Sequence, residues 1–158
     1  MAFLEWLEMS ALAELVAVSL WGYPIMLSLH AVGLAVVVGV LAMVDLRVMG
    51  CFSSMEIVPM RKLINLAKAG FIVNLLSGFA LFSSQATYFI GHKAFIIKII
   101  AIVLAIVNAV ILKSMLAKNA ESWDQGTAIS MNAKLLAFSS LILWSVAMIA
   151  GRLIAYVY

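Results

Sequence analysis

Residues 23–50 read YPIMLSLHAVGLAVVVGVLAMVDLRVMG. The part from 24 to 44 is apolar enough and long enough to cross about 30 Å of hydrocarbon as a helix. It nevertheless carries a titratable imidazole, His30, well inside the run, and it ends abruptly in Asp45 and Arg47. We therefore predict a membrane span that holds a polar site and is ended by an ion pair between Asp45 and Arg47 at the membrane surface.

The composition extends this interpretation to the whole chain. Of its 158 residues, 66% are hydrophobic and 11% are charged, whereas a soluble domain carries about 25% charged residues. A chain of this length has room for about four spans with short connections. We predict one all-α domain, residues 1–158, that forms an integral membrane four-helix bundle; its spans are expected at about 23–44, 66–90, 93–112 and 135–157.

The segment before the first span differs from a cleaved signal peptide. No Lys or Arg precedes Arg47, and Glu5, Glu8 and Glu14 interrupt the first apolar run. We predict that residues 2–20 form an interfacial helix at the membrane surface. In the connection after the third span, Thr127 is a candidate N-cap for the fourth.

The basic residues indicate an orientation in the membrane. Four lie around the connection after the first span and three after the third, against three on the other side of the membrane. The positive-inside rule therefore predicts that these two connections lie in the cytoplasm and that both termini lie on the outer side. A set of aromatic residues falls on the same outer side: Trp21, Tyr23, Tyr88, Tyr156 and Tyr158. Because the net charge of +3 is dispersed along the rims of the apolar runs, we expect the lipid bilayer as a partner and no nucleic acid.

One polar residue from each span falls in a single layer near the outer face. Counted along the helices, His30, Gln85, Lys98 and Arg152 each lie roughly 7 to 10 Å below the outer boundary. The layer holds two permanent cations and no acid from within the spans, and buried charges need a partner. We expect a bound anionic ligand among these residues, or else the N-terminal glutamates folded over them.

Simpler roles are open for each of these residues. Lys98 and Arg152 lie near enough to the interface to snorkel, and His30 could be a packing residue that hydrogen-bonds another helix. His92 falls at a turn and is expected to be a solvated loop residue unless it serves as a second metal ligand. Met26, one turn before His30, could offer a thioether to copper, but this pair alone is a weak signal.

Three stretches carry a resemblance over nearly the whole chain: LHAVGLAVVVG followed by VDLR, then FIIKIIAIVLAIVNAVILK, and finally AGRLIAY. They resemble an uncharacterised family of small bacterial four-span inner-membrane proteins. The resemblance implies a bacterial inner-membrane location, so that both termini would lie in the periplasm. More distantly, His-x-x-Gly in one span with a Lys early in a later one is similar to copper-resistance D membrane domains and to four-helix, haem-b-containing protoporphyrinogen oxidases. The resemblance implies that His30 holds iron and that Lys98 is needed nearby. Members of the family often end the third span in His, where this chain has Lys113, so a second ligand from that position is absent.

These observations lead to a haem hypothesis. A neutral imidazole is a standard iron ligand, a helix bundle can hold a porphyrin, and the propionates would supply the anions that Lys98 and Arg152 lack. Gln85 belongs to the same layer, and Gly33, one turn beyond His30, would leave room for a flat ring. We therefore predict a haem b site with an electron-transfer or quinone-linked role, and His92 as a candidate sixth ligand.

The main alternative is a non-enzymatic accessory or assembly subunit. The stripe of Ala31, Ala35 and Gly39 lies away from His30 and could pack another copy of the chain or another subunit of a membrane complex. Copper transfer is weaker, because no series of Met and His residues marks a pathway. A proton-coupled transporter is weaker still, because no acid lies in the middle of any span.

Overall fold

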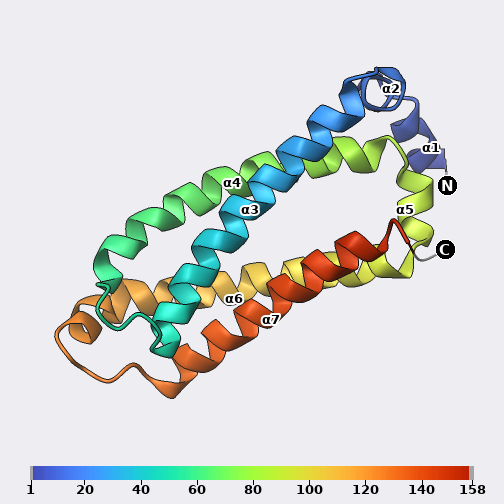
Figure 1. Cartoon of the computed structure of the whole chain (residues 1–158). Helices are drawn as coiled ribbons and strands as arrows, with labels where there is room; N and C mark the ends of the chain where they lie inside the picture. The colour runs from blue at the N-terminus through green and yellow to red at the C-terminus, as the bar shows by residue number, and fades with distance from the viewer. Residues whose placement is uncertain (1, 157–158) are drawn as a thin grey trace.

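The structure is a computed structural model that describes residues 2–156. Within this range the chain forms seven α-helices and no strand, and four of the helices are long and apolar enough to cross a membrane. These four are α3 (Gly22–Met49), α4 (Ile57–Ser83), α6 (Lys93–Asp124) and α7 (Met131–Leu153). The predicted all-α membrane four-helix bundle is confirmed (Figure 1).

The four long helices form two hairpins. α3 packs most extensively on α4, α6 packs on α7, and the hairpins meet mainly where α3 contacts α7, whereas α4 and α6 touch over a much smaller region. The turns 50–56 and 125–130 lie at one end of the bundle, which we call the loop end (Figure 1). The short helix α5 (Ala86–Gly91) lies at the opposite end, the α5 end, together with the first and last described residues.

The helices continue beyond the predicted spans at the loop end. α3 runs on to Met49 and stops at Gly50, whose φ of 106° lies in the left-handed region that favours glycine. α4 begins at Ile57, with Pro59 in its first turn, where the missing N–H of proline costs no hydrogen bond. α6 extends to Asp124 through a polar segment that is predicted to be a connection. The segment is helical because its Lys, Ala, Glu and Leu residues are good helix formers even outside lipid.

Two predicted boundaries differ from the structure. Ser130, and not Thr127, is the N-cap of α7, and its hydroxyl accepts a hydrogen bond from the backbone N–H of Ala133. The predicted second span is interrupted, because Gln85 has φ −151° and ψ 46° and separates α5 from α4. The predicted end of the last span at 157 and the aromatic residue Tyr158 lie outside the described residues.

Small residues face the inside of the bundle and large apolar residues face outward. In α6 and α7 the buried positions recur every three or four residues and are dominated by alanine: Ala101, Ala105, Asn108, Leu112, Leu116, Ala120, Ala133, Ala137, Ser140, Trp144, Ala147 and Ala150. Many Leu, Ile, Val and Phe side chains are exposed on the helix surfaces. This arrangement is typical of helices that meet in lipid, where close backbone approach replaces the hydrophobic effect as the source of association.

A charged cluster ties three helices together at the loop end. The Asp124 carboxylate, at the last residue of α6, accepts hydrogen bonds from the backbone N–H groups of Ile57 (2.8 Å) and Val58 (2.9 Å) at the start of α4. Arg47 of α3 lies 3.8 Å from the same carboxylate, and its Nε donates to the carbonyl of Met55. The predicted Asp45–Arg47 pair is therefore wrong, since Arg47 pairs with Asp124 and the two side chains leave α3 in different directions.

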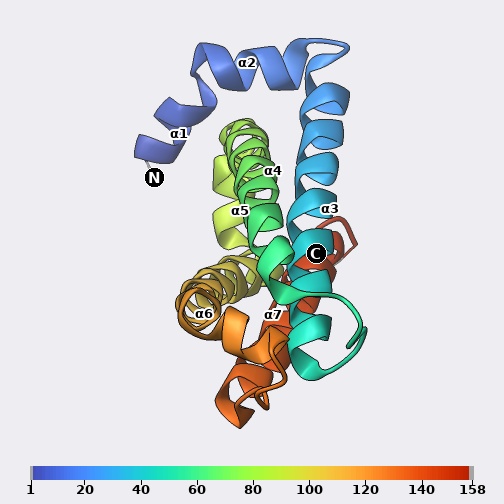
Figure 2. The same ribbon diagram turned by 90° about the vertical axis from the view of Figure 1, so that its left-hand side faces the viewer.

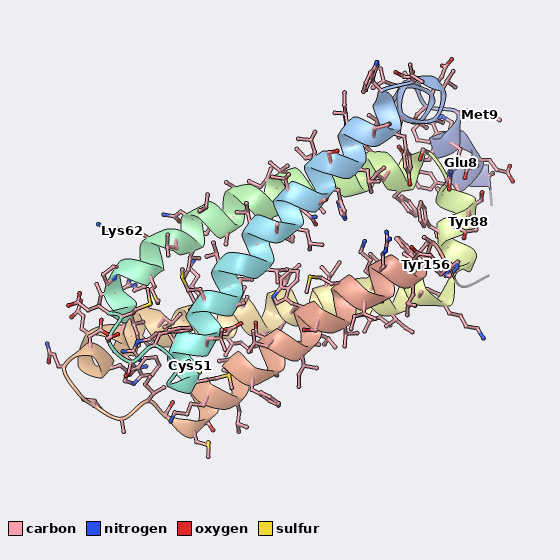
Figure 3. All side chains as sticks on the ribbon, viewed as in Figure 1. Glu8, Met9, Cys51, Lys62, Tyr88 and Tyr156 are labelled. Atoms are coloured by element: carbon pink, nitrogen blue, oxygen red, sulfur yellow. The ribbon has the colours of Figure 1, made fainter. Side chains whose placement is uncertain are left out.

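The N-terminal segment crosses the α5 end as two helices, and not as the single helix predicted for residues 2–20. α1 (Ala2–Glu8) and α2 (Ala11–Val18) are separated at Ser10, whose side chain caps α2. α2 packs on α3 and α4, and α1 packs on α5, so the segment lies across this end of the bundle (Figure 2). Figure 3 shows Glu8, Tyr88 and Tyr156 at this end, and Cys51 and Lys62 at the loop end.

One specific contact attaches α1 to α5. The Glu8 carboxylate accepts hydrogen bonds from both the hydroxyl (2.7 Å) and the backbone N–H (2.8 Å) of Thr87. The hydroxyl contact, followed by the backbone contact, lowers the pKa of Glu8 below its ordinary value of 4.5.

We expect Asp124→Ala to destabilise the bundle by about 2 kcal/mol, because α4 loses its N-terminal cap and Arg47 loses its ion pair. The free energy of unfolding is measured by titration of the protein from mild detergent into sodium dodecyl sulfate. Glu121→Ala is the matched control, because Glu121 is exposed on the same helix. Equal effects of the two substitutions would contradict the capping role.

The Glu8 contact should make the docking of α1 dependent on pH. Because the pKa is lower in the folded state, the contact stabilises docking above the ordinary pKa and is lost as the pH falls through the lowered value. The protection factor of the Thr87 amide, its exchange rate compared with the intrinsic rate at the same pH, should therefore fall on acidification from about pH 6 to pH 3. Thr87→Val should weaken this dependence, and an unchanged protection factor across the range in the wild type would refute it.

Candidate functional site

His30 projects from α3 toward α4 and is half-buried. Its Nδ1 lies 2.9 Å from the backbone carbonyl of Asn74, so the N–H at this position donates to that oxygen. The Asn74 side chain returns a hydrogen bond of 2.8 Å from Nδ2 to the carbonyl of His30. The imidazole covers Gly78, where an added Cβ would stand 2.9 Å from Cε1. The Nδ1 bond and the close approach to Gly78 fix the ring orientation, and the Asn74 bond to the His30 carbonyl joins the two helices at the same place.

The second ring nitrogen of His30 has a different environment. In residues 2–156 the hydrogen bonds of this side chain all involve Nδ1, the weaker one being a 3.5 Å contact with the Ser77 hydroxyl. With the Nδ1 proton committed to the Asn74 carbonyl, a neutral ring carries its lone pair on Nε2. This is the arrangement in which proteins present imidazole to a metal, with the outer nitrogen oriented by a backbone carbonyl.

Gly33 has a role other than the one predicted. An added Cβ at Gly33 would stand 2.7 Å from the backbone N of Asn74 and 2.8 Å from the carbonyl O of Gly70. On the other helix, an added Cβ at Gly70 would stand 2.8 Å from Cγ1 of the Val36 side chain. The space beside Gly33 is therefore filled by the backbone of α4 and does not receive a flat ring. Gly33 brings the two helices together and thereby positions His30.

Lys98 reaches the same region from α6. Its side chain is half-buried and runs over Gly151 of α7, where an added Cβ would stand 3.3 Å from Nζ. The ammonium is close enough to act electrostatically on the His30 imidazole. The ion pair of Arg47 with Asp124 is the one salt bridge in the described part of the chain, so Lys98 has no carboxylate partner there. The imidazole and the ammonium thus come from different hairpins and lie within electrostatic range of each other.

Arg152 and Gln85 are exposed and lie at the ends of their helices. The Arg152 guanidinium donates a 2.8 Å hydrogen bond to the Tyr156 hydroxyl and lies 5.2 Å from the centre of that ring. Gln85 occupies the break between α4 and α5. The predicted four-residue layer therefore separates into an inner pair, His30 and Lys98, and an outer pair at the α5 end.

His92 is buried at the junction of α5 and α6, with 9% of its surface exposed. The prediction of a solvated loop residue is therefore wrong, because the ring packs against Tyr88 with centroids 5.6 Å apart. Within residues 2–156 no group of three or more His, Cys, Asp or Glu side chains is arranged to hold a metal ion. The role of His92 as a second ligand stays a prediction.

The burial of one polar residue is not predicted from the sequence. Asp45 is 1% exposed, and its Oδ2 has no hydrogen-bond partner in residues 2–156. It lies in the wall of a cavity of about 400 Å³ between the four long helices, nearer the loop end. A signal for this burial exists, because Asp45 follows Val37, Leu41 and Val44 on one helical face. Arg47, two residues later, instead favours the interpretation of Asp45 as one half of an ion pair.

The chain was compared with protein-family models, with curated proteins and with solved structures, and no match was found in any of the three comparisons.

We expect Gly33→Ala to destabilise the bundle by about 1–3 kcal/mol, because the added methyl group must push α4 away from α3. Gly39→Ala on the same helix is the matched control, since nothing lies within 4 Å of a Cβ at that position. That control should be neutral or slightly stabilising, as alanine is the better helix former. The same detergent titration measures both, and an equal response would refute the close-contact role of Gly33.

Proposed function

We propose that this chain is a multi-pass inner-membrane protein that binds haem b, or a similar anionic redox ligand, at His30 and Lys98, with an electron-transfer or quinone-linked role. The observation that carries the proposal is the His30 geometry: Nδ1 is committed to the Asn74 carbonyl at 2.9 Å, which leaves Nε2 as the lone-pair nitrogen. A histidine that only packs between helices would make the same Nδ1 bond, so the spectrum described below decides between the two roles.

The residues around His30 fit the ligand chemistry of such a group. Asn74 orients the imidazole, and Gly78 permits the ring to lie against α4. Lys98 supplies a cation that lacks a carboxylate partner in the described residues and would pair with an acidic substituent of the ligand. When bound, haem b supplies one-electron chemistry, and its potential depends on the axial ligand and the surrounding polarity. Arg152, which is exposed beside Tyr156, is a weaker candidate for the same pairing.

The position in the membrane follows from charge asymmetry. His30 lies eight residues after Gly22, about 12 Å along α3 from the α5 end. Most of the basic residues lie toward the loop end, and the positive-inside rule favours that end in the cytoplasm. The site would then belong to the periplasmic half of the bilayer, with both termini in the periplasm.

A second candidate function is an accessory or assembly subunit of a membrane complex. It is favoured by the small residues Ala31, Ala35 and Gly39, which are all exposed on one side of α3. Small residues on a lipid-facing surface allow another helix to approach closely. In this case the chain would form a homo-oligomer or bind another subunit, and the His30 contacts would serve helix packing alone.

The absorption spectrum of the purified protein tests the proposal. We expect a Soret band in the wild type that is lost in His30→Ala, while His30→Gln elutes as the wild type in size exclusion and also lacks the band. Lys98→Ala should retain haem about tenfold less well, because an ion pair with the ligand is lost. Lys93→Ala, at the exposed start of α6, is the matched control and should retain haem normally.

Two outcomes would overturn the haem proposal. A colourless wild type that takes up no added haem and runs as a defined oligomer would favour the accessory role. Haem that survives His30→Ala unchanged would exclude His30 as the ligand. Metal analysis of the same sample distinguishes iron from copper, and stoichiometric copper that is lost in Met26→Leu would favour the copper alternative.

A further inference from the structure

The α4–α6 cavity, of about 400 Å³, lies away from His30 and Lys98, in the half of the bundle near the loop end. Val37, Leu41 and Trp144 of α3 and α7 line it from within, and Phe71 and Ile106 line it from α4 and α6. Ile72 and Val110 also belong to its wall and are exposed on the outer surface. The cavity therefore opens sideways between α4 and α6, which touch over a smaller region than any other neighbouring pair of the four long helices. Its volume is in the range of small-molecule sites.

Two buried polar atoms of the lining residues lack partners within residues 2–156. The Asp45 carboxyl has an unpaired acceptor at Oδ2, and the Trp144 indole has an unpaired donor at Nε1. Ser140 faces the Asp45 carboxyl from α7. Buried polar groups without partners are costly and uncommon, and each calls for an explanation such as a bound molecule. An occupant that satisfies both must carry a hydroxyl donor and an oxygen acceptor on an otherwise apolar body.

We propose that the α4–α6 cavity binds an isoprenoid quinol from the bilayer. One hydroxyl of the head group donates to Asp45, whose carboxyl turns about a soft torsion to present Oδ2, and the other oxygen accepts from the Trp144 N–H. The tail leaves through the lateral opening past Ile72 and Val110. This inference stands on the cavity alone and does not require haem at His30.

A phospholipid satisfies these groups less well. An acyl chain would fill the apolar part of the cavity but offers no donor to Asp45, and a phosphate would meet that carboxyl unfavourably. Lys68 and Lys113 also line the cavity, and both are exposed. They could hold a lipid phosphate, so the test below separates the two occupants.

Isothermal titration of the full chain in detergent micelles with a short-chain decyl benzoquinol, kept reduced, tests the proposal. We expect saturable binding to the wild type, at least tenfold weaker binding to Asp45→Asn, and severalfold weaker binding to Trp144→Phe. Ala109→Phe, which fills the cavity, should abolish binding. Ser145→Ala is the matched control, because Ser145 is exposed on α7 and its hydroxyl bonds the carbonyl of Leu141, so binding should be unchanged.

Additional variants and a measurement of bound lipid separate the possible outcomes. Asp45→Asn is nearly isosteric, so it gives an answer even if Ala109→Phe fails to fold. Equal quinol affinity in the wild type and Asp45→Asn, or no binding to the wild type, overturns the proposal. So does a copurified phospholipid, detected by native mass spectrometry, whose retention depends on Lys68 and Lys113 and not on Asp45. His30→Ala should bind the quinol normally, so failure of the haem proposal leaves this one standing.

Discussion

The structure depends on the close approach of α3 to α4, which Gly33 and Gly70 permit. Any side chain at Gly33 would overlap the backbone of α4, whose Asn74 N lies 2.7 Å from the position of an added Cβ. The same approach lets Asn74 exchange hydrogen bonds with His30 in both directions. Since lipid provides no hydrophobic force between helices, such backbone contacts and their hydrogen bonds hold the bundle together. The orientation of the one imidazole in the spans is thus a consequence of helix packing.

Much of the fold could be predicted from local patterns, because lipid imposes long apolar runs and internally bonded helices. The stretch 24–44 identifies α3, and Pro24 and Pro59 mark the first turns of α3 and α4. The extension of α6 to Asp124 could not be predicted, because outside the membrane hydropathy no longer marks a helix. The capping of α4 by Asp124 could not be predicted either, since it joins residues 67 positions apart.

The candidate site could be predicted only in part. The depth of a residue in the membrane can be estimated by counting along its helix, whereas the direction in which its side chain points cannot. His30 and Lys98 lie at similar depths and within electrostatic range of each other, while Arg152 and Gln85, at similar expected depths, lie exposed at helix ends. Gly33 is predicted to face a ligand, but it faces α4. The two possibilities differ only in which neighbour that face of α3 is turned toward. Asp45 is predicted to form an ion pair with Arg47, two positions later. Residues with this spacing are about 200° apart around a helix and cannot face one another.

α4 and α6 are connected to each other at both of their ends, and this limits how far the two helices can separate. At the loop end the Asp124 carboxylate holds the first N–H groups of α4, and at the other end α5 joins the two helices through a short covalent link. Neither helix is therefore free to swing away as a rigid rod, and the gap between them widens only by bowing near mid-membrane. Such a frame keeps the lateral opening of the cavity narrow, and it favours small changes in the width of that opening over large relative movements of the two helices.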